Sequence, residues 1–468
     1  MGMKKRLWQW TARVAKLCVK PVAWVAGVAA TLSPAVQKPA AAQVVPTADG
    51  AGTTVSESGD QYDIAGGTQA GGNLFHEFEE FSLSETETAN FTSDSGVFNI
   101  VGRVSAANPS YIDGTVQVEG SDADLYLINP SGVLFGPNAQ LALPGSFTAT
   151  TADQVGFGEQ WLSAADTNPD YAALSEDPSA FRFSESDAGA VVNQGNLAVA
   201  PGESIALVGG SVVNTGELEA PGGEIGLVAV GGESTVRLKT PGSLLSLEVS
   251  ERGLAEGMDG DFAAAALPGL LTGQESPAAD TLELLPNGDV VLRHAEGDVT
   301  VDAGDVAVSG TVSVVSETAA GGVVALSGES VEIAGGVVDA SGESGGSVRI
   351  GGGFAEEEMP AAETTHLSSD ATVRADGATG DGGDIYVGAR HRATVRGEIS
   401  ARGEGAGGFV ETSADYIDVN GAEVDATGAS AHGLRRAHSQ FQYLPDRSAS
   451  ALGHSHPSHR PLPHSHQY

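Results

Sequence analysis

Near-copies of one segment stand 21 residues apart in the middle of the chain. VVNQGNLAVAPGESIALVGG begins at Val191, and VVNTGELEAPGGEIGLVAVG begins at Val212, so that Asn193 recurs as Asn214. A period of about 20 to 25 residues, with short β-rich segments and Gly, Asn or Asp corners, is typical of a parallel β-helix in which each repeat forms one coil. We therefore expect an all-β fold, a right-handed parallel β-helix with loop excursions.

In such a solenoid each strand pairs with its counterpart in the next coil, about 4.8 Å away, and the inward apolar side chains form one continuous core. Leu197 and Leu218 are predicted to stack in successive coils. The repeat continues more weakly, with Gly-Gly pairs that precede expected strands at 347–350, 384–387 and 409–412. A β-sandwich is the alternative all-β fold, but it does not require near-copies at a fixed spacing.

The composition agrees with a repeat array. There are 64 glycines among 468 residues, and glycine at this level supplies many corners. Hydrophobic residues make up 41% of the chain and aromatic residues only 6%, so the core must be mainly aliphatic. This content argues against wholesale disorder.

Residues 1–42 are interpreted as a secretory signal peptide. A basic leader without acids is followed by an apolar run from Val22 to Leu32 and by small residues before Gln43. The run is too short for a permanent membrane-spanning helix, although an N-terminal anchor is the alternative. The only cysteine, Cys18, lies in this segment, so the mature chain cannot form disulfides.

The mature chain is strongly acidic. Cleavage after residue 42 removes seven of the 23 basic residues and none of the 61 acidic residues, which leaves a net charge of −45. Such a surface repels the phosphates of nucleic acids and anionic lipid headgroups, and it favours solubility. We therefore expect no nucleic-acid partner.

Two corners flank a short apolar segment in LINPSGVLFGPNAQL, from Leu127 to Leu141. Val133 to Phe135 are expected to form a buried strand, bounded by turns at Asn129-Pro130 and Pro137-Asn138. The segment therefore has the pattern of one coil.

The segment from Leu127 to Leu141 belongs to a series of three sequence motifs in the N-terminal half of the chain. NLFHEFEEFSL spans 73–83, FNIVGRVSAANPSYIDGTVQV spans 98–118, and LYLINPSGVLFGPNAQLALPGSFTATTADQVGF spans 125–157. In this order the three motifs closely resemble the N-terminal secretion domain of filamentous haemagglutinin-type exoproteins, the large β-helical proteins exported by two-partner secretion. The resemblance covers residues 43–240. It implies that the turn formed by Asn129, Pro130, Ser131 and Gly132 takes part in recognition by the secretion partner, although the family often has Asn where Ser131 stands.

The resemblance also implies a route of export. The signal peptide would take the chain across the inner membrane, an outer-membrane β-barrel transporter would recognise the N-terminal domain, and the chain would fold coil by coil outside. We therefore expect a secreted exoprotein, extracellular or at the cell surface, that acts as an adhesin or structural filament. Its targets would be a host cell, a neighbouring cell or a polysaccharide.

Several boundaries follow from the same patterns. The segment 159–187 is interpreted as a loop excursion, with a partner-binding helix as the alternative, and 43–75 is the expected N-terminal cap. The expected domains are the signal peptide 1–42, the secretion domain 43–250, an irregular insertion 251–284, further coils 285–430 and a tail 431–468.

Charge, composition and periodicity all change after Ser430. The tail contains seven of the eleven histidines and no pattern of alternating strand residues. We predict that residues 431–468 are disordered and that the last coil is uncapped. A frameshift in the gene would explain the three changes together, and a genuine His-rich tail is the alternative. The tail histidines could bind Zn or Ni loosely, but no preformed metal site is expected.

A polysaccharide-active β-helix enzyme is the alternative function. Glu77 and Glu79 share one face of an expected strand, where a solvated surface is the ordinary interpretation. Asp381 and Asp384 in GDGGD hint at calcium, but the repeat of calcium-binding solenoids is absent. We predict no catalytic residue, metal ligand or cofactor. Three or more carboxylates that converge in a groove would favour the enzyme.

Overall fold

The computed structural model describes residues 43–442, apart from 49, 185–187, 239–245, 250–280, 285–289, 295–296, 301, 353–360 and 439–440. Of residues 246–249, 281–284, 290–294, 297–300, 438 and 441–442 it describes the backbone alone. The expected signal peptide and most of the insertion expected at 251–284 lie outside the described residues. Among the described residues, no helix is long and apolar enough to span a membrane.

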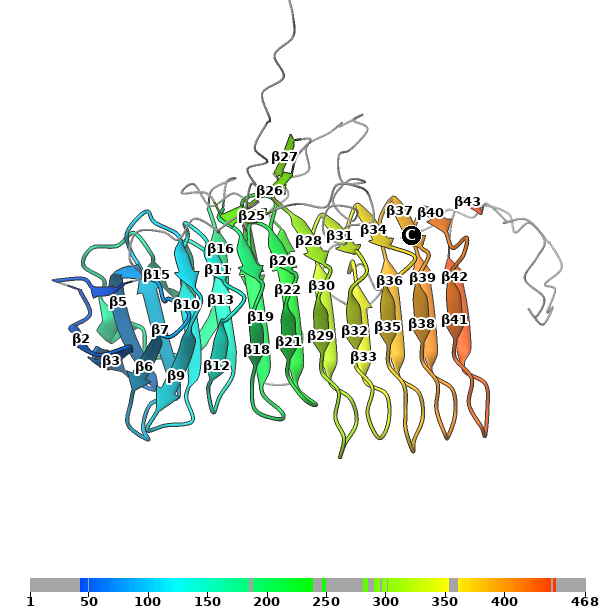
Figure 1. Ribbon diagram of the computed structural model, residues 1–468, viewed down its shortest axis with the longest axis horizontal. Coiled ribbons are helices and arrows are strands. Elements are labelled where there is room, and N and C mark those ends of the chain that lie inside the picture. The colour runs from blue at the N-terminus through cyan, green and yellow to red at the C-terminus, as the bar shows by residue number, and fades with distance from the viewer. Residues whose placement is uncertain are drawn as a thin grey trace, which may run out of the picture. The chain divides into compact units, whose positions relative to one another are not determined.

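Three long sheets form the coil walls, and each coil passes through them in turn (Figure 1). Sheet A comprises β1 (Val44–Pro46), β5 (Asn73–Phe81), β7 (Asn99–Val104), β10 (Asp124–Ile128), β13 (Phe147–Thr150), β19 (Ser204–Gly209), β22 (Glu224–Ala229), β30 (Val323–Ser327), β33 (Ser347–Ile350), β36 (Asp384–Gly388), β39 (Phe409–Ser413) and β42 (Leu434–His438), with β4 (Thr68–Ala70) paired to β5. Sheet B comprises β2 (Thr53–Ser58), β3 (Gln61–Gly66), β6 (Thr88–Thr92), β9 (Thr115–Glu119), β12 (Gln140–Ala142), β18 (Asn196–Ala198), β21 (Glu217–Glu219), β29 (Thr311–Ser313), β32 (Val337–Asp339), β35 (Thr372–Arg374), β38 (Glu398–Ser400) and β41 (Glu423–Asp425). Sheet C comprises β8 (Ser110–Ile112), β11 (Val133–Phe135), β17 (Val191–Asn193), β20 (Val212–Asn214), β28 (Asp305–Val308), β31 (Ser330–Ile333), β34 (Thr364–Leu367), β37 (Arg392–Val395), β40 (Tyr416–Asp418) and β43 (Phe441–Gln442).

Successive coils pair in parallel and in register, so the chain is the right-handed parallel β-helix that the repeat predicts. Leu197 of β18 is the partner of Leu218 of β21, as expected. Asn193 and Asn214 are also partners, and the Nδ2 of Asn193 donates to the Oδ1 of Asn214 at 2.8 Å. The 21-residue spacing is therefore the length of one coil, and the β-sandwich alternative is wrong.

One inward row of sheet A shows how the core is built. Partner by partner through the stack, this row consists of buried apolar side chains: Ile100, Leu125, Phe147, Ile205, Ile225, Val324, Val348, Ile385 and Val410. Each of these residues covers the one before it, which is why a coil cannot bury its apolar face without a neighbour.

Antiparallel strands close the N-terminal end of the stack, as expected for a cap. β2 and β3 form a hairpin, and β1 and β4 both pair antiparallel to β5. The first parallel coil therefore does not leave its apolar interior open.

The C-terminal end differs from the prediction. β42 pairs in parallel with β39, and β43 pairs with β40, so the coils extend to Gln442 and the disorder predicted from residue 431 is wrong up to that point. Backbone hydrogen bonds of a parallel ladder do not require alternating side chains, and Leu434 to Ala437 are all exposed. The rest of the tail, 443–468, lies outside the described residues.

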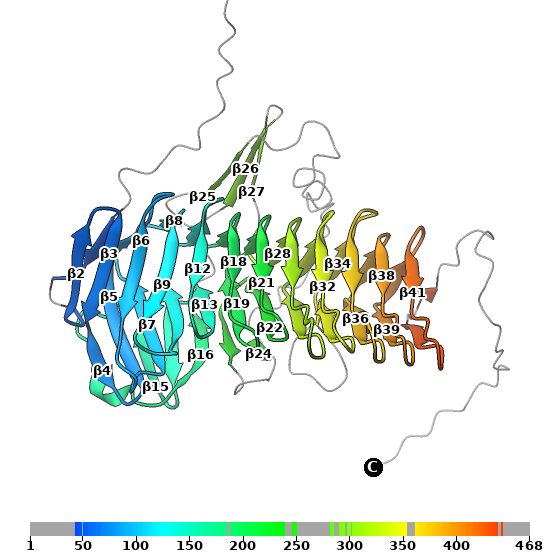
Figure 2. The same ribbon diagram turned by 60° about the horizontal axis from the view of Figure 1, so that its bottom comes forward.

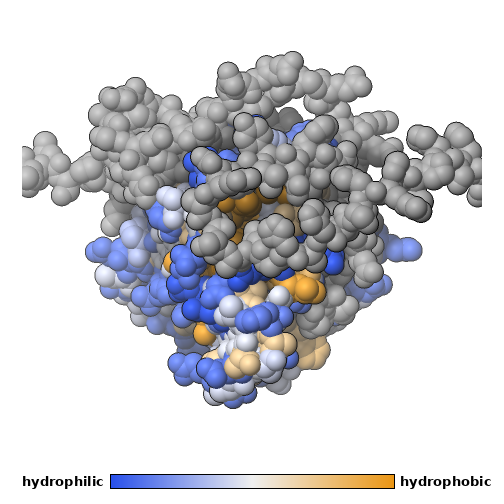
Figure 3. Space-filling model, turned by 90° about the vertical axis from the view of Figure 1, so that its right-hand side faces the viewer, coloured by the Kyte–Doolittle hydropathy of each residue, from blue (hydrophilic) through white to orange (hydrophobic). Residues whose placement is uncertain are grey.

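Arg435 ends the inward apolar row. It is the partner of Val410, and its Nη2 lies 3.6 Å from the Oδ1 of Asp425 on β41. Arg435 is an exposed residue of the last described coil. Figure 3 views this end and shows hydrophilic residues together with hydrophobic patches near the middle of the visible described surface.

A further sheet covers the outer face of sheet A in the first coils (Figure 2). Sheet D is antiparallel, in the order β15 (Gln160–Ser163), β14 (Gln154–Phe157), β16 (Pro178–Phe183), β23 (Ser234–Arg237) and β24 (Ser246–Val249), and the 3-10 helix η1 (Tyr171–Ala173) lies between β15 and β16. Phe157 and Phe181 of sheet D share a buried cluster with Phe75 and Val101 of sheet A. Residues 159–187 leave the coils, as expected, but the prediction that they form a loop is wrong. They form strands and a second buried apolar layer.

Sheet E is a small antiparallel meander of β25 (Thr281–Leu284), β26 (Val290–His294) and β27 (Gly297–Thr300). Coils resume only at β28, so the described residues between 285 and 300 belong to this meander and not to the coils expected from 285.

Candidate functional site

The turn from Asn129 to Gly132, which the resemblance assigns to partner recognition, forms a tight corner between β10 and β11. The backbone N of Gly132 donates to the carbonyl of Asn129 at 3.0 Å, and the backbone N of Ser131 donates to the Oδ1 of Asn129 at 3.0 Å. Gly132 has a φ of 117°, a conformation that side chains with a Cβ rarely adopt. The predicted turn and the buried strand that follows it, β11, are both confirmed.

Asn129 ties this corner to the coils on both sides. Its side chain is 0% exposed, and its Nδ2 donates to the carbonyl of Asn108 and to the Oγ of Ser110, both at 3.0 Å, in the preceding coil. Its backbone N donates to the carbonyl of Thr150 in the following coil. The amide of Asn129 is therefore a structural part of three coils.

The next coil also covers the turn. A Cβ placed on Gly189 would lie 2.6 Å from the backbone N of Gly132 and 2.7 Å from the carbonyl of Pro130, so only glycine allows this close approach. Asn129 and Gly132 are buried, whereas Pro130 and Ser131 are partly exposed. Of the four predicted residues, only these two present surface to a partner of the folded protein.

A buried ion pair connects the coils to sheet D. Glu77 and Arg103 are partners on β5 and β7, and the Arg103 Nη2 lies 2.8 Å from the Glu77 Oε2. The Tyr171 hydroxyl, from η1, donates to the same Oε2 at 3.2 Å. The Arg103 Nη1 donates to the carbonyls of Ser163 at 2.5 Å and Ala164 at 3.3 Å. Both side chains of the pair are almost completely buried.

The solvated face expected for Glu77 is therefore wrong, because η1 and sheet D cover this side of β5; Glu79 is exposed as expected. Burial raises the pKa of Tyr171 to about 12, the nearby Arg103 lowers it, and Glu77 raises it. The phenol stays protonated and donates to Glu77. A sequence signal for this cluster exists, since Arg103 is the only basic residue between 43 and 181 and lies in an apolar strand.

His76 is buried inside the first coil. Its ring lies 5.6 Å from that of Phe91 and 6.3 Å from that of Phe78, centroid to centroid, and its strand partner is Gly102, which leaves room for the imidazole. Neither ring nitrogen has a hydrogen-bond partner among the described residues. Burial lowers the pKa of His76 from 6.5 to about 4, so the ring is neutral at neutral pH.

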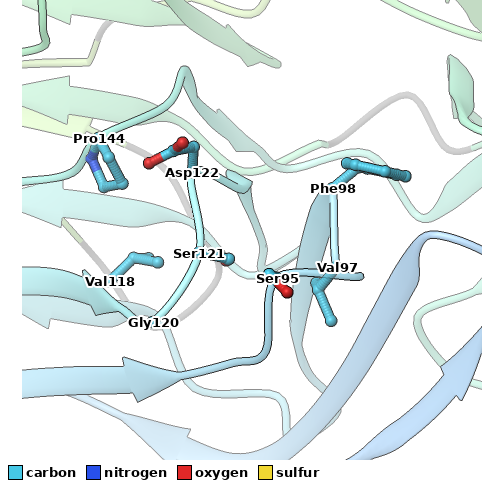
Figure 4. A pocket seen from close by; sticks show the side chains of 8 residues that line it. All are labelled: Ser95, Val97, Phe98, Val118, Gly120, Ser121, Asp122 and Pro144. Carbon is cyan, nitrogen blue, oxygen red and sulfur yellow. The ribbon is translucent and has the colours of Figure 1, made fainter.

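Carboxylates with raised pKa values lie on β28, β31 and the turn before β31. Burial raises the pKa of Asp305 to about 7, with added repulsion from Asp302, Glu332 and Glu329. Burial also raises the pKa of Glu329 and of Glu332, and the Oε1 of Glu332 lies 2.8 Å from the Nδ1 of His366. None of these side chains lines the cavity of about 480 Å³ that is bounded by Val97, Val118 and Pro144 in the first coils (Figure 4).

The calcium suggestion receives no support from the geometry. The Asp381 Oδ1 accepts a hydrogen bond from the backbone N of Ala406 at 2.7 Å, and Asp384 is an exposed residue at the start of β36. Within the described parts of the chain, no group of three or more His, Cys, Asp or Glu side chains is arranged to hold a metal ion. The tail histidines from His454 onward lie outside the described residues.

Comparisons with known proteins found a matching family and similar solved structures. Residues 42–267 match the family described as the TPS secretion domain. The crystal structure of the HMW1 secretion domain from Haemophilus influenzae is similar, at 20% identity and a TM-score of 0.44, and the match covers 84% of this chain and 98% of that chain. The filamentous hemagglutinin secretion domain is similar at 17% identity and a TM-score of 0.27, with 84% and 99% covered. No curated protein sequence matches the chain.

The fold and the family match define a β-helical secretion domain. Residues 42–267 are a TPS secretion domain, the N-terminal domain of filamentous haemagglutinin-type exoproteins, as the three motifs predict. The protein is therefore a two-partner secreted exoprotein that is exported across the outer membrane.

The buried ion pair predicts a specific response to mutation. Arg103→Met removes the cation and leaves the Glu77 carboxylate buried, which should lower the free energy of unfolding by about 3 to 5 kcal/mol. Urea denaturation of the purified protein measures this loss. The double variant Arg103→Met with Glu77→Met should recover most of it, and a double variant as unstable as the single one would contradict the assigned pairing.

His76 predicts how stability depends on pH. Its folded pKa is near 4 and its unfolded value near 6.5, so the unfolded chain binds the extra proton between these values. The stabilisation is complete above pH 6.5 and falls as the pH drops towards 4, by a total of about 3 kcal/mol. His76→Leu should remove this component of the pH dependence in denaturation curves. Equal pH dependence in both proteins would show that His76 is not buried in its neutral form.

Proposed function

We propose that this exoprotein passes through an outer-membrane β-barrel transporter and acts outside the cell, free or at the surface, as an adhesin or structural filament. The match of residues 42–267 to the secretion-domain family carries the proposal. The coils that follow this domain add a repetitive, largely polar outer surface, which suits contact with a cell surface or a polysaccharide.

The construction of the fold supports sequential folding during export. Each coil pairs mainly with its immediate neighbours, and the cap formed by β1 to β4 precedes the first parallel coil in the chain. An emerging chain could therefore add coils one at a time to a closed start. No disulfide is needed, because the only cysteine lies in the leader.

Expression with and without the cognate transporter tests the proposal. The full-length protein should accumulate in the medium or at the cell surface only when the transporter is present, and in the periplasm when it is absent. Export that is equal in both strains would overturn it.

We further propose that the turn from Asn129 to Gly132 acts in export by building its corner, with Pro130 and Ser131 as the part open to the partner. The burial of Asn129 and its bonds to three coils support this role. Asn193 offers a matched control, because it is also 0% exposed and its Oδ1 accepts from the backbone N of Gly195 at 3.0 Å in the same local pattern.

The double variant Asn129→Ala with Pro130→Ala should lower the extracellular yield strongly and leave signal-peptide cleavage intact. The corner loses an amide that satisfies buried backbone groups and a fixed φ, at a cost of about 1 to 3 kcal/mol for the amide alone. Immunoblots of medium and periplasm measure both steps. Asn193→Ala should reduce stability with a smaller loss of yield, and an equal loss would mean that the turn contributes only stability.

A further inference from the structure

Aromatic side chains lie on the outside of the later coils. Among the described residues from 305 to 438 they are Tyr386, Phe409 and Tyr416, and none of the three belongs to the buried core, which is aliphatic there. In the secretion domain, by contrast, rings such as that of Phe91 are fully buried. Packing of the core therefore does not account for the aromatic residues of the later coils.

Two of these rings form a strip with Leu434 on the outer face of sheet A. Tyr386, Phe409 and Leu434 belong to β36, β39 and β42, which are neighbours in this sheet (Figure 1). The ring centres of Tyr386 and Phe409 lie 5.4 Å apart, and Phe409 is the strand partner of Leu434, which is 65% exposed. Both rings are partly exposed. This aromatic strip has one member in each of three coils, about 4.8 Å apart, and so follows the stack of coils.

An arginine holds each ring. The Cζ of Arg349, in the preceding coil, lies 5.9 Å from the centre of the Tyr386 ring, and the Cζ of Arg436 lies 5.8 Å from the centre of the Phe409 ring. Contacts of a guanidinium with an aromatic ring are attractive and restrict both side chains. A ligand of the aromatic strip would therefore meet rings that are already ordered, which lowers the entropic cost of binding.

Charges of both signs surround the aromatic strip. Asp384, the strand partner of Phe409, is exposed and interacts with Arg349. Glu411 is the partner of Tyr386, and its Oε2 lies 3.9 Å from the Nη1 of Arg436. Two carboxylates and two guanidinium groups leave the strip without an excess charge. The described residues from 305 to 438 contain 18 acidic and eight basic residues, so the surrounding coils repel a polyanion.

A chain of uncharged sugars fits these features. The C–H faces of a sugar ring pack on aromatic rings, and its hydroxyl groups can both donate to carboxylates and accept from guanidinium groups. A polysaccharide repeats these groups along its length, as the coils repeat theirs along the stack. Each coil of the strip can therefore contact a successive part of one ligand chain.

We propose that the aromatic strip binds a neutral polysaccharide whose chain runs along the stack of coils. This inference rests on the proposed extracellular function, and it names the class of target and the surface that binds it. The rings supply the packing surface, while Asp384, Glu411 and Arg436 supply hydrogen bonds to the hydroxyl groups.

Affinity electrophoresis of the purified full-length protein tests this site. The probes are three neutral polysaccharides, dextran, laminarin and galactomannan, with heparin as the anionic comparison. The protein should bind at least one neutral probe and not heparin. Tyr386→Ala and Phe409→Ala should each weaken that binding about tenfold, as expected for the loss of a ring contact. Tyr386→Phe keeps the ring and should retain most of the binding.

Tyr416→Ala is the matched control. Tyr416 is a partly exposed residue of β40 in sheet C, and the Cζ of Arg392 lies 4.7 Å from the centre of its ring. This variant loses the same kind of ring–arginine contact outside the aromatic strip, so it should have a similar unfolding temperature to Phe409→Ala but unchanged binding. An equal loss of binding in both variants would show that the rings act through stability and would overturn the inference.

Three other results would also overturn it: no binding of any neutral probe, preference for heparin, or unchanged binding in Phe409→Ala. Self-association that Phe409→Ala abolishes, measured by sedimentation without polysaccharide, would assign the strip to a contact between copies instead. The variants should still be exported in a transporter-dependent manner, so failure of this inference leaves the proposed export intact. Export without the transporter would contradict the proposed function itself.

Discussion

The in-register pairing of each coil with the next is the interaction on which the rest of this structure depends. Inward side chains such as Ile205 and Ile225 are buried only because the partner residue of the neighbouring coil covers them. Glycines such as Gly189 permit the close approach of coil to corner. The two ends of the described stack differ from its middle: antiparallel strands close the first, and Arg435 ends the apolar row in the last described coil.

The features of the secretion domain follow from this constraint. The backbone N–H and C=O groups of a buried corner and of the adjacent coils need hydrogen-bond partners. The side-chain amide of Asn129 supplies a partner to both, since it accepts from the backbone N of Ser131 and donates to the carbonyl of Asn108. Sheet D covers the outer face of the first coils, so the charged partners Glu77 and Arg103 are enclosed and must neutralise each other. The only Lys or Arg charge of residues 43–181 is thereby removed from the surface, while the same segment carries 20 acidic residues.

The sequence predicted those parts of the fold that repeat. Near-copies at Asn193 and Asn214 indicate the coil length, and the corners around Val133 to Phe135 indicate where one buried strand begins and ends. Contacts that occur once could not be predicted in this way. Glu77 meets Tyr171, a residue 94 positions away on an excursion with no repeat pattern, so its burial has no local signal. The strand β42 was missed because its pairing comes from the backbone, whereas its side chains are exposed.

Pairwise cysteine crosslinking tests the coil register most directly, because the only cysteine of the chain, Cys18, lies ahead of the coils in the sequence. Asn196 and Glu217 are partners in successive coils, about 4.8 Å apart, within the range that a disulfide spans. Asn196 and Thr311 are separated by one further coil, beyond that range. Under mild oxidation, Asn196→Cys with Glu217→Cys should form an intramolecular disulfide and Asn196→Cys with Thr311→Cys should not. Equal crosslinking of both pairs, or of neither, would contradict the stacked coils.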